Sequence, residues 1–321
     1  MNDTSLNIVF MGTPEFAVSI LDALVHSNHK IVGVVTATDK PAGRGQQLKG
    51  SAVKEYAIDR GLNLLQPNSL KDPEFIDDLN NLRADLFVVV AFRMLPEVVW
   101  SMPPKGTINL HASLLPQYRG AAPINWALIN GEIKTGVTTF FIDKEIDTGR
   151  VIDQLETQIS ENMTVGDLYE ELMKLGSILT VKTVDNIANC IIEPKKQEDL
   201  IVSQLKHAPK IFKQDCEINW EKSMLENHNL IRGLSPYPGA WTKIYSLKKQ
   251  EWVNFKILRT EKSLLKVKNS QNLELDDRGI LLPCKDFYLI VCDLQPEGKR
   301  KMHFKEFLAG HKLEDWALKM P

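Results

Sequence analysis

Cysteine is scarce in this sequence, and the spacing of the few that occur argues against a metal site. The chain has four cysteines in 321 residues, and none of them forms a C-x-x-C pair. A structural zinc site needs such pairs, or histidines at a fixed spacing from them. We therefore expect no metal, and we interpret the scattered cysteines as small buried residues in a reducing compartment.

Long hydrophobic runs are also missing. No stretch approaches the ~18 consecutive apolar residues of a membrane span, and the first residues, MNDTSLNIVF, lack the basic segment of a signal peptide. A hydrophobic content of 43% and a charged content of 25% are typical of a soluble globular protein. We expect a cytoplasmic protein that is monomeric, has no membrane partner and is long enough for two domains.

The phosphate-binding motifs of common nucleotide enzymes are absent as well. Neither Gly12-Thr13-Pro14 nor the loop PAGRG at 41–45 matches G-x-G-x-x-G or G-x-x-x-x-G-K-[ST]. We therefore do not expect NAD or ATP as a ligand, whatever the fold class.

The net charge of −2 hides an asymmetry along the chain. Residues 204–321 contain 21 Lys and Arg against 15 Asp and Glu, a net +6, whereas the remainder has 18 against 26, a net −8. A basic C-terminal part points weakly to a polyanion such as RNA. A solvated surface that has merely drifted basic is the alternative, and charge alone favours it.

Strands and helices alternate in the first half of the chain. The segment DLFVVVAF at 85–92 has three consecutive valines, which is typical of a central parallel strand covered on both faces. Further strands are expected at 6–11, 30–36, 107–111 and 136–142. This alternation predicts an α/β domain with a doubly wound parallel sheet, closed by a long helix over 164–187.

The composition changes after residue 190. A polar stretch over 191–209, with Pro194 and Pro209, reads as a linker. Beyond a helix at 225–232, short strands are expected at 240–245, 251–259, 264–268, 279–283 and 287–294, which suggests a small β-barrel. We place a catalytic domain at 1–190, a linker at 191–207 and a second domain at 208–321.

Asn109 and His111 end a predicted strand, where an open α/β sheet binds its ligands. Residues i and i+2 of a strand point to the same face, so both side chains can enter one cleft. Histidine can exchange a proton near neutral pH, and an amide N–H can stabilise an oxygen that becomes negative. Acyl transfer to an amine needs both, although a histidine that only hydrogen-bonds locally is an equal alternative.

Two loops follow this strand. Residues 113–123 contain two prolines and a glycine, and a loop of this length at a sheet end is usually functional, although it can also be a purely structural connection. Asp143 and Asp147 follow the next strand, and a carboxylate near a histidine can orient its ring. A turn in which Asp accepts backbone N–H groups is the alternative, and spacing does not choose between the two aspartates.

These residues resemble the methionyl-tRNA formyltransferase family over both halves of the chain. The matching segments are MGTPEFAV at 11–18, PAGRG at 41–45, NLHASLLPQYRGAAPINWA at 109–127, DTG at 147–149, APKI at 208–211, HNLIRGLSPYPGAWT at 228–242, EGK at 297–299 and EFLAGH at 306–311. The SLLPxYRGxxP element is specific to folate-dependent formyltransferases, and the C-terminal segments indicate the tRNA enzyme among them.

The resemblance implies a Rossmann-like N-terminal domain and a C-terminal barrel related to the OB-fold. It also implies 10-formyltetrahydrofolate as the donor and the α-amino group of initiator methionyl-tRNA as the acceptor. The family's catalytic trio corresponds to Asn109, His111 and Asp147. Its arginine on a loop that meets the tRNA acceptor end corresponds to Arg44. Its folate-contacting segment corresponds to Ser113, Leu114, Leu115 and Pro116.

Two departures border the expected folate cleft. Arg93 stands where many members have a small residue, and the stretch around Lys144 is unusually charged, so the detailed donor contacts stay open. Two rival hypotheses also stay open: a formyltransferase that acts on a small amine, such as a sugar nucleotide or glycinamide ribonucleotide, and a non-catalytic RNA-binding protein on an enzyme fold.

Overall fold

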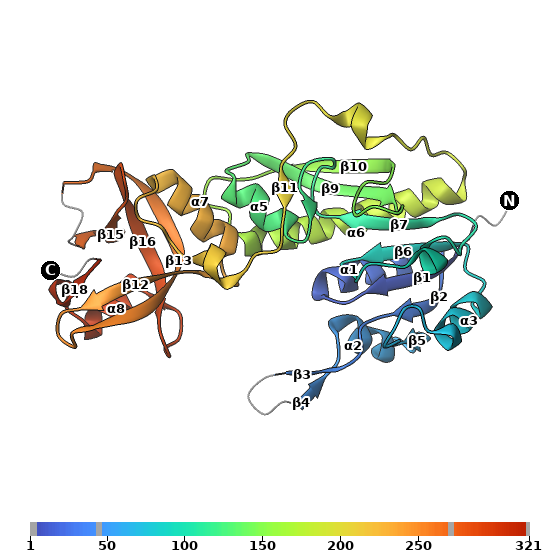
Figure 1. Cartoon of the computed structure of the whole chain (residues 1–321), viewed down its shortest axis with the longest axis horizontal. Helices are drawn as coiled ribbons and strands as arrows, with labels where there is room; N and C mark the ends of the chain where they lie inside the picture. The colour runs from blue at the N-terminus through green and yellow to red at the C-terminus, as the bar shows by residue number, and fades with distance from the viewer. Residues whose placement is uncertain (1–4, 43–46, 269–272, 319–321) are drawn as a thin grey trace. The chain divides into compact units, whose positions relative to one another are not determined.

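The computed structural model describes residues 5–42, 47–268 and 273–318 (Figure 1). By contacts the chain forms two compact units. The first unit consists of 1–120, 135–157 and 169–207, and the second consists of 121–134, 158–168 and 208–321. Within the described ranges, no helix is both long enough and apolar enough to cross a membrane.

A seven-stranded sheet forms the centre of the first unit, in the order β10-β9-β7-β6-β1-β2-β5. Its strands are β1 (Asn7–Gly12), β2 (Lys30–Val35), β5 (Leu64–Leu65), β6 (Leu86–Val90), β7 (Thr107–His111), β9 (Lys134–Phe141) and β10 (Val151–Gln158). The five strands from β5 to β7 are parallel, and every residue of β6 is buried. The predicted Rossmann-like parallel sheet is thus confirmed.

Helices cover both faces of this sheet, as the alternating pattern requires. They are α1 (Glu15–Val25), α2 (Ala52–Asp59), α3 (Pro73–Asn81), α4 (Glu97–Trp100) and α6 (Val165–Ala188). Val9, Met11 and Phe87 pack on one face with Phe75 and Leu79 of α3. A short hairpin of β3 (Lys40–Ala42) and β4 (Gln47–Lys49) projects from this unit.

The predicted strand at 136–142 does not continue the parallel order. It forms β9, which runs antiparallel to β7, with Ile108 paired to Phe141 and His111 paired to Thr138. The chain between β7 and β9 leaves and re-enters the sheet at the same edge without crossing it, and this makes the two strands antiparallel. β9 therefore begins beside His111 and ends beside Ile108, so the loop after β9 starts near the first residues of β7, where the Ile142 N–H donates to the Thr107 carbonyl.

The second unit contains a curled antiparallel sheet in the order β14-β15-β16-β13-β12-β18, with β17 paired to β16. The strands are β12 (Ala240–Ser246), β13 (Glu251–Lys266), β14 (Glu274–Asp276), β15 (Gly279–Pro283), β16 (Phe287–Pro296), β17 (Met302–His303) and β18 (Trp316–Ala317). This arrangement is consistent with the predicted OB-fold-like barrel. The two strands predicted at 251–259 and 264–268 are one strand, because β13 stays paired to β16 through register shifts that bend it.

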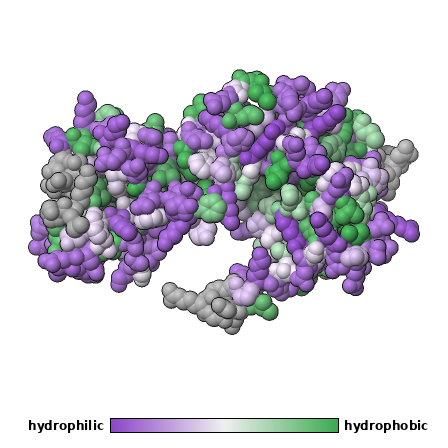
Figure 2. Space-filling model, in the orientation of Figure 1, coloured by the Kyte–Doolittle hydropathy of each residue, from purple (hydrophilic) through white to green (hydrophobic). Residues whose placement is uncertain are grey.

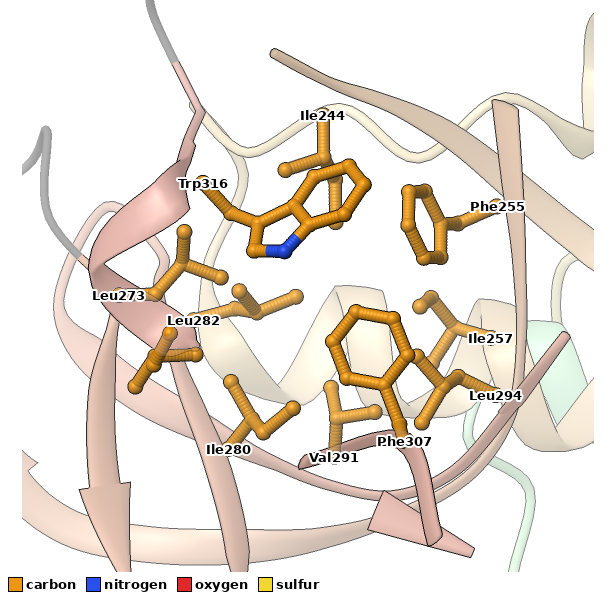
Figure 3. A pocket seen from close by; sticks show the side chains of 11 residues that line it. Ile244, Phe255, Ile257, Leu273, Ile280, Leu282, Val291, Leu294, Phe307 and Trp316 are labelled. Atoms are coloured by element: carbon orange, nitrogen blue, oxygen red, sulfur yellow. The ribbon is translucent and has the colours of Figure 1, made fainter. Parts of the chain in front are cut away.

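An apolar core fills the concave side of this curled sheet. Figure 3 shows Phe255, Phe307 and Trp316 around a cavity in it. The Phe255 ring meets the other two edge to face, with centroids 5.3 Å apart for Phe255 and Trp316. On the face shown in Figure 2, hydrophilic residues cover most of the second unit. The helix α8 (Phe304–Gly310) contributes Phe304 and Phe307 to the core.

The motif HNLIRG lies on α7 (Met224–Leu234) and holds two segments that come from earlier in the chain. Asn125 of α5 (Pro123–Ile129) donates its amide N–H to the Gly233 carbonyl at 2.8 Å. A Cβ on Gly233 would lie 2.7 Å from Ile129, so only glycine allows this approach of the helices. The segment 158–168 is held by buried Arg232, which donates to the carbonyls of Ser160 and Met163. Both segments belong to the second unit although they lie within residues 1–190 of the sequence. The domain limits predicted above, 1–190, 191–207 and 208–321, stay a prediction.

Candidate active site

Asn109 and His111 lie on the same face of β7, at the carboxyl edge of the parallel strands. Leu110 points to the opposite face, where α6 approaches so closely that a Cβ on Gly176 would be 2.7 Å from its side chain. Asn109 is half-buried, and His111 is 6% exposed. The strand therefore presents an amide and an imidazole together, as its alternation predicts.

The hydrogen bond that His111 makes fixes its tautomer. Its Nε2 lies 2.9 Å from the Tyr118 carbonyl oxygen. A carbonyl can only accept, so Nε2 carries a hydrogen and donates it. In the neutral ring Nδ1 then has the lone pair, and Nδ1 faces the Asp147 carboxylate, with Oδ2 at 3.8 Å. Nδ1 is thus the atom of His111 that can gain and lose a proton.

Asp147, and not Asp143, lies against the histidine. The Asp147 carboxylate is largely buried and accepts a hydrogen bond from the Gly120 N–H at 3.0 Å. Asp143 is exposed, and its carboxylate accepts from the Glu145 N–H and the Thr148 hydroxyl, which closes a local turn. The structure brings together His111 and Asp147 and leaves Asp143 in the turn that leads to them.

The residues Ser113, Leu114, Leu115 and Pro116 form a tightly held loop beside His111. The Ser113 hydroxyl donates to the Gln117 carbonyl at 2.6 Å, and the Ser113 carbonyl accepts from the Thr138 hydroxyl at 2.6 Å. Gln154 donates to the Leu115 carbonyl at 2.9 Å. Ser113 and Leu115 are buried, whereas Leu114 is half-buried. The loop therefore has a fixed shape that can face a ligand.

Three further positions singled out from the sequence are Arg44, Arg93 and Lys144. Arg44 is outside the described residues; the hairpin that leads to it begins next to Asp39, whose pKa is lowered by a hydrogen bond from Lys54 and another from Gln66. Arg93 donates to the backbone carbonyls of Asn68 and Pro67, at 3.0 and 2.5 Å. Arg93 thus connects the loop after β6 to the segment that contains Pro67 and Asn68. Lys144 is exposed.

Sequence reasoning missed Gln197, which belongs to the predicted linker. It begins a short 3-10 helix, η1 (Gln197–Leu200), and is 0% exposed. Its amide oxygen accepts from the Nε and Nη2 atoms of Arg119 at 2.9 and 2.7 Å, and its amide nitrogen donates to the carbonyls of Asp147 and Gly149 at 2.8 and 2.9 Å. No local pattern marks this residue, because its partners are 48 or more positions away.

The arrangement supplies the parts that acyl transfer to an amine requires. It has an amide donor, an imidazole whose Nδ1 faces a carboxylate, and that carboxylate, which can stabilise an imidazolium. Within the described part of the chain, no group of three or more His, Cys, Asp or Glu could hold a metal ion.

Comparison with known proteins finds matches over both parts of the chain. Residues 6–184 match the family model described as formyl transferase, and 210–312 match that of the formyl transferase C-terminal domain. The chain is 48% identical over 318 residues to the methionyl-tRNA formyltransferase of Bacteroides thetaiotaomicron, covering 98% of each chain. It is 51% identical over 316 residues to that of Flavobacterium psychrophilum, covering 98% of this chain and 99% of the relative.

Solved structures share the fold at lower identity. WlaRD, a sugar 3N-formyl transferase crystallised with dTDP and 5-N-formyl-THF, matches with a TM-score of 0.62 and 22% identity over 92% of this chain and 99% of its own. HypX from Aquifex aeolicus, in complex with tetrahydrofolic acid, matches with a TM-score of 0.62 and 16% identity over 94% of this chain and 47% of its own.

Proposed function

This chain belongs to the methionyl-tRNA formyltransferase family, and we propose that it transfers the formyl group of 10-formyltetrahydrofolate to the α-amino group of initiator methionyl-tRNA. The product is N-formylmethionyl-tRNA, which begins translation. The observation that carries the proposal is the placement of His111 Nδ1 opposite Asp147, next to Asn109, at the carboxyl edge of the sheet. The chain is accordingly a one-carbon group transferase.

The amine nitrogen attacks the formyl carbon, and the carbonyl oxygen becomes an oxyanion. The Asn109 amide donates a hydrogen bond to that oxygen. Because Nε2–H of His111 is engaged with the Tyr118 carbonyl, Nδ1 serves the reaction: it takes the proton that the amine loses, and Asp147 stabilises the resulting cation. The bond from the formyl carbon to N10 of the folate then breaks, and N10 receives the proton. No covalent enzyme intermediate is needed when the two substrates are held in contact.

In this proposal the folate donor binds against the loop formed by Ser113, Leu114, Leu115 and Pro116. Its support is the fixed shape of that loop beside His111, together with the folates bound by two proteins of the same fold. Folate acts as a co-substrate. The contacts near Arg93 and Lys144 border this cleft.

The acceptor tRNA is bound by the basic C-terminal part of the chain, residues 204–321, and by Arg44, in a monomeric cytoplasmic enzyme. The net +6 over 204–321 supports this assignment. The names of the 48–51% identical relatives, which cover 98% of this chain, support it more strongly than the charge does.

A formyl-transfer assay with purified protein tests the proposal. With 10-formyltetrahydrofolate as donor, kcat/KM for initiator methionyl-tRNA should exceed that for a dTDP-linked amino sugar by at least ~10²-fold, since only the tRNA matches the proposed acceptor. Between about 50 and 200 mM salt the KM for tRNA should rise by orders of magnitude, because binding to phosphates releases counterions. The KM for the folate should stay nearly constant.

Two results would contradict it. Faster formylation of the sugar amine would assign the chain to the small-amine enzymes, whose fold it shares. Specific tRNA binding without formyl transfer would instead identify an RNA-binding protein on an inactive enzyme fold.

A further inference from the structure

The segment that was predicted as a linker is fastened to both catalytic loops of the first unit. Lys206 accepts a hydrogen bond on its carbonyl from the Tyr118 N–H at 2.7 Å, and Tyr118 is the residue whose own carbonyl receives the His111 Nε2–H. The Lys206 N–H donates to Gln117 Oε1 at 2.8 Å. Residues 197–207 therefore form part of the wall of the site.

Gln197 is the point where this segment joins the loop of Asp147. Its primary amide is fully used, with two N–H donors from Arg119 on the oxygen and two carbonyl acceptors on the nitrogen. One of those carbonyls is that of Asp147 itself. A buried amide whose four hydrogen bonds are all made holds its partners rigidly, since losing any of them leaves a polar group unsatisfied.

The backbone of Asp147 needs such support. Its φ of +55° lies in the left-handed region, which residues other than glycine seldom occupy. A conformation of this kind persists only where the surroundings hold it. It also directs the carboxylate: Asp147 Oδ2 accepts from the Gly120 N–H and faces His111 Nδ1, while the Asp147 carbonyl turns to Gln197.

We propose that Gln197 is a positioning residue for formyl transfer, which rests on the proposed function. It binds the Asp147 carbonyl on one side and Arg119 on the other. Arg119 directly follows Tyr118, so a single side chain sets the loop that orients the His111 ring relative to the loop that carries the carboxylate. Loss of Gln197 changes the rate of the chemical step rather than the binding of either substrate.

Two variants of Gln197 separate its two sets of hydrogen bonds. Gln197→Met keeps the volume and removes every hydrogen bond. Gln197→Glu keeps the acceptor for Arg119 but sets a carboxylate oxygen opposite the carbonyls of Asp147 and Gly149. Both should lower kcat by about 10–100-fold, the usual cost of losing a group that orients a functional residue, while the KM values for folate and tRNA stay within about threefold. If one variant fails to fold, the other serves alone.

A double-mutant cycle distinguishes positioning from general destabilisation. In an Asp147→Asn background, Gln197→Met should lower the single-turnover rate by less than about threefold, because the residue through which it acts is already impaired. An equal fold loss with and without Asp147 would overturn the proposal, and so would a change confined to KM.

His29→Ala is the matched control for stability. His29 is buried at the opposite edge of the same sheet, where it accepts from the Leu6 N–H and contacts Asp185. The His29→Ala variant should lower the thermal midpoint about as much as Gln197→Met does, while its kcat stays near that of the wild type. A loss of kcat as large as that of Gln197→Met would overturn the proposal.

Amide hydrogen exchange over residues 143–150 gives a readout that needs no substrate. Exchange should be faster in Gln197→Met than in the wild type, because the hydrogen bonds to Asp147 and Gly149 are lost. Unchanged exchange would overturn the proposal. A wild-type protein that formylates no methionyl-tRNA would refute the proposed function instead, and the exchange result would still decide whether Gln197 holds this loop.

Discussion

Each unit of this chain buries a histidine whose Nε2 donates to a backbone carbonyl, yet the two residues differ at Nδ1. His111 donates to Tyr118 at 2.9 Å, and its Nδ1 faces the Asp147 carboxylate at 3.8 Å. His228 donates to Glu161 at 3.3 Å, and its Nδ1 accepts from the Thr260 hydroxyl at 2.9 Å. Both belong to motifs of the family, so the sequence alone does not separate their roles.

The partner of Nδ1 determines what each ring can do. A neutral hydroxyl satisfies His228, and burial lowers its pKa to about 4, so the ring is uncharged near pH 7. It links α7 to the segment 158–168 and to β13, and it has no proton to exchange in that range. In the proposed mechanism, the Asp147 carboxylate opposite Nδ1 of His111 stabilises the imidazolium that forms when the ring takes the proton of the amine. On the proposed mechanism, the comparison sets a histidine that exchanges a proton against one that only makes structural hydrogen bonds.

The largest effect that we expect concerns Asn109, which lies on the same face of β7 as His111. In the proposed mechanism the Asn109 amide donates to the oxyanion, so Asn109→Ala should lower kcat on the order of 10²–10³-fold while the thermal midpoint changes little. Steady-state formyl transfer measures this loss. Near-normal turnover would mean that a different group stabilises the oxyanion. It would contradict the role that we propose for Asn109 beside His111.

A smaller effect should appear in stability at the other histidine. The pKa of His228 in the folded protein, about 4, is below its usual value of 6.5, so the folded state binds fewer protons. Its contribution is fully present above about pH 6.5 and is lost as the pH falls toward 4, and it amounts to on the order of 2–3 kcal/mol. Urea unfolding followed by tryptophan fluorescence should show this decline in the wild type.

His228→Gln is the control for that titration, because glutamine can make both hydrogen bonds without gaining a proton. The difference in the free energy of unfolding between wild type and variant should change across pH 6.5 to 4, whereas the carboxylates contribute equally to both. A difference that does not vary with pH would show that His228 titrates normally and is not the structural member of the pair.

Much of this site could be predicted from local pattern. The alternation of a strand places Asn109 and His111 on one face, and the valines at 88–90 identify the central strand. Spacing could not choose between Asp143 and Asp147, since both follow the same strand. Only the path of the loop, with its left-handed residue, turns one carboxylate to His111 and leaves the other in a turn.

The remaining features depend on contacts that span long stretches of chain. The direction of β9 follows from where the chain re-enters the sheet, and the continuity of β13 follows from its pairing with β16. Gln197 is 50 residues from Asp147 and 78 from Arg119, so no window of sequence contains the pattern. A polar residue in a polar stretch looks solvated until its partners are placed around it.

The same substitution in the two histidines tests this comparison most directly. Single-turnover formyl transfer to initiator methionyl-tRNA is measured for His111→Gln and His228→Gln at saturating 10-formyltetrahydrofolate and neutral pH. His111→Gln should lose at least ~10² in rate, because glutamine cannot take up the proton of the amine. His228→Gln should stay within about threefold of the wild type, since its ring makes only structural hydrogen bonds. Equal losses, or a greater loss in His228→Gln, would contradict the assignment of proton transfer to His111.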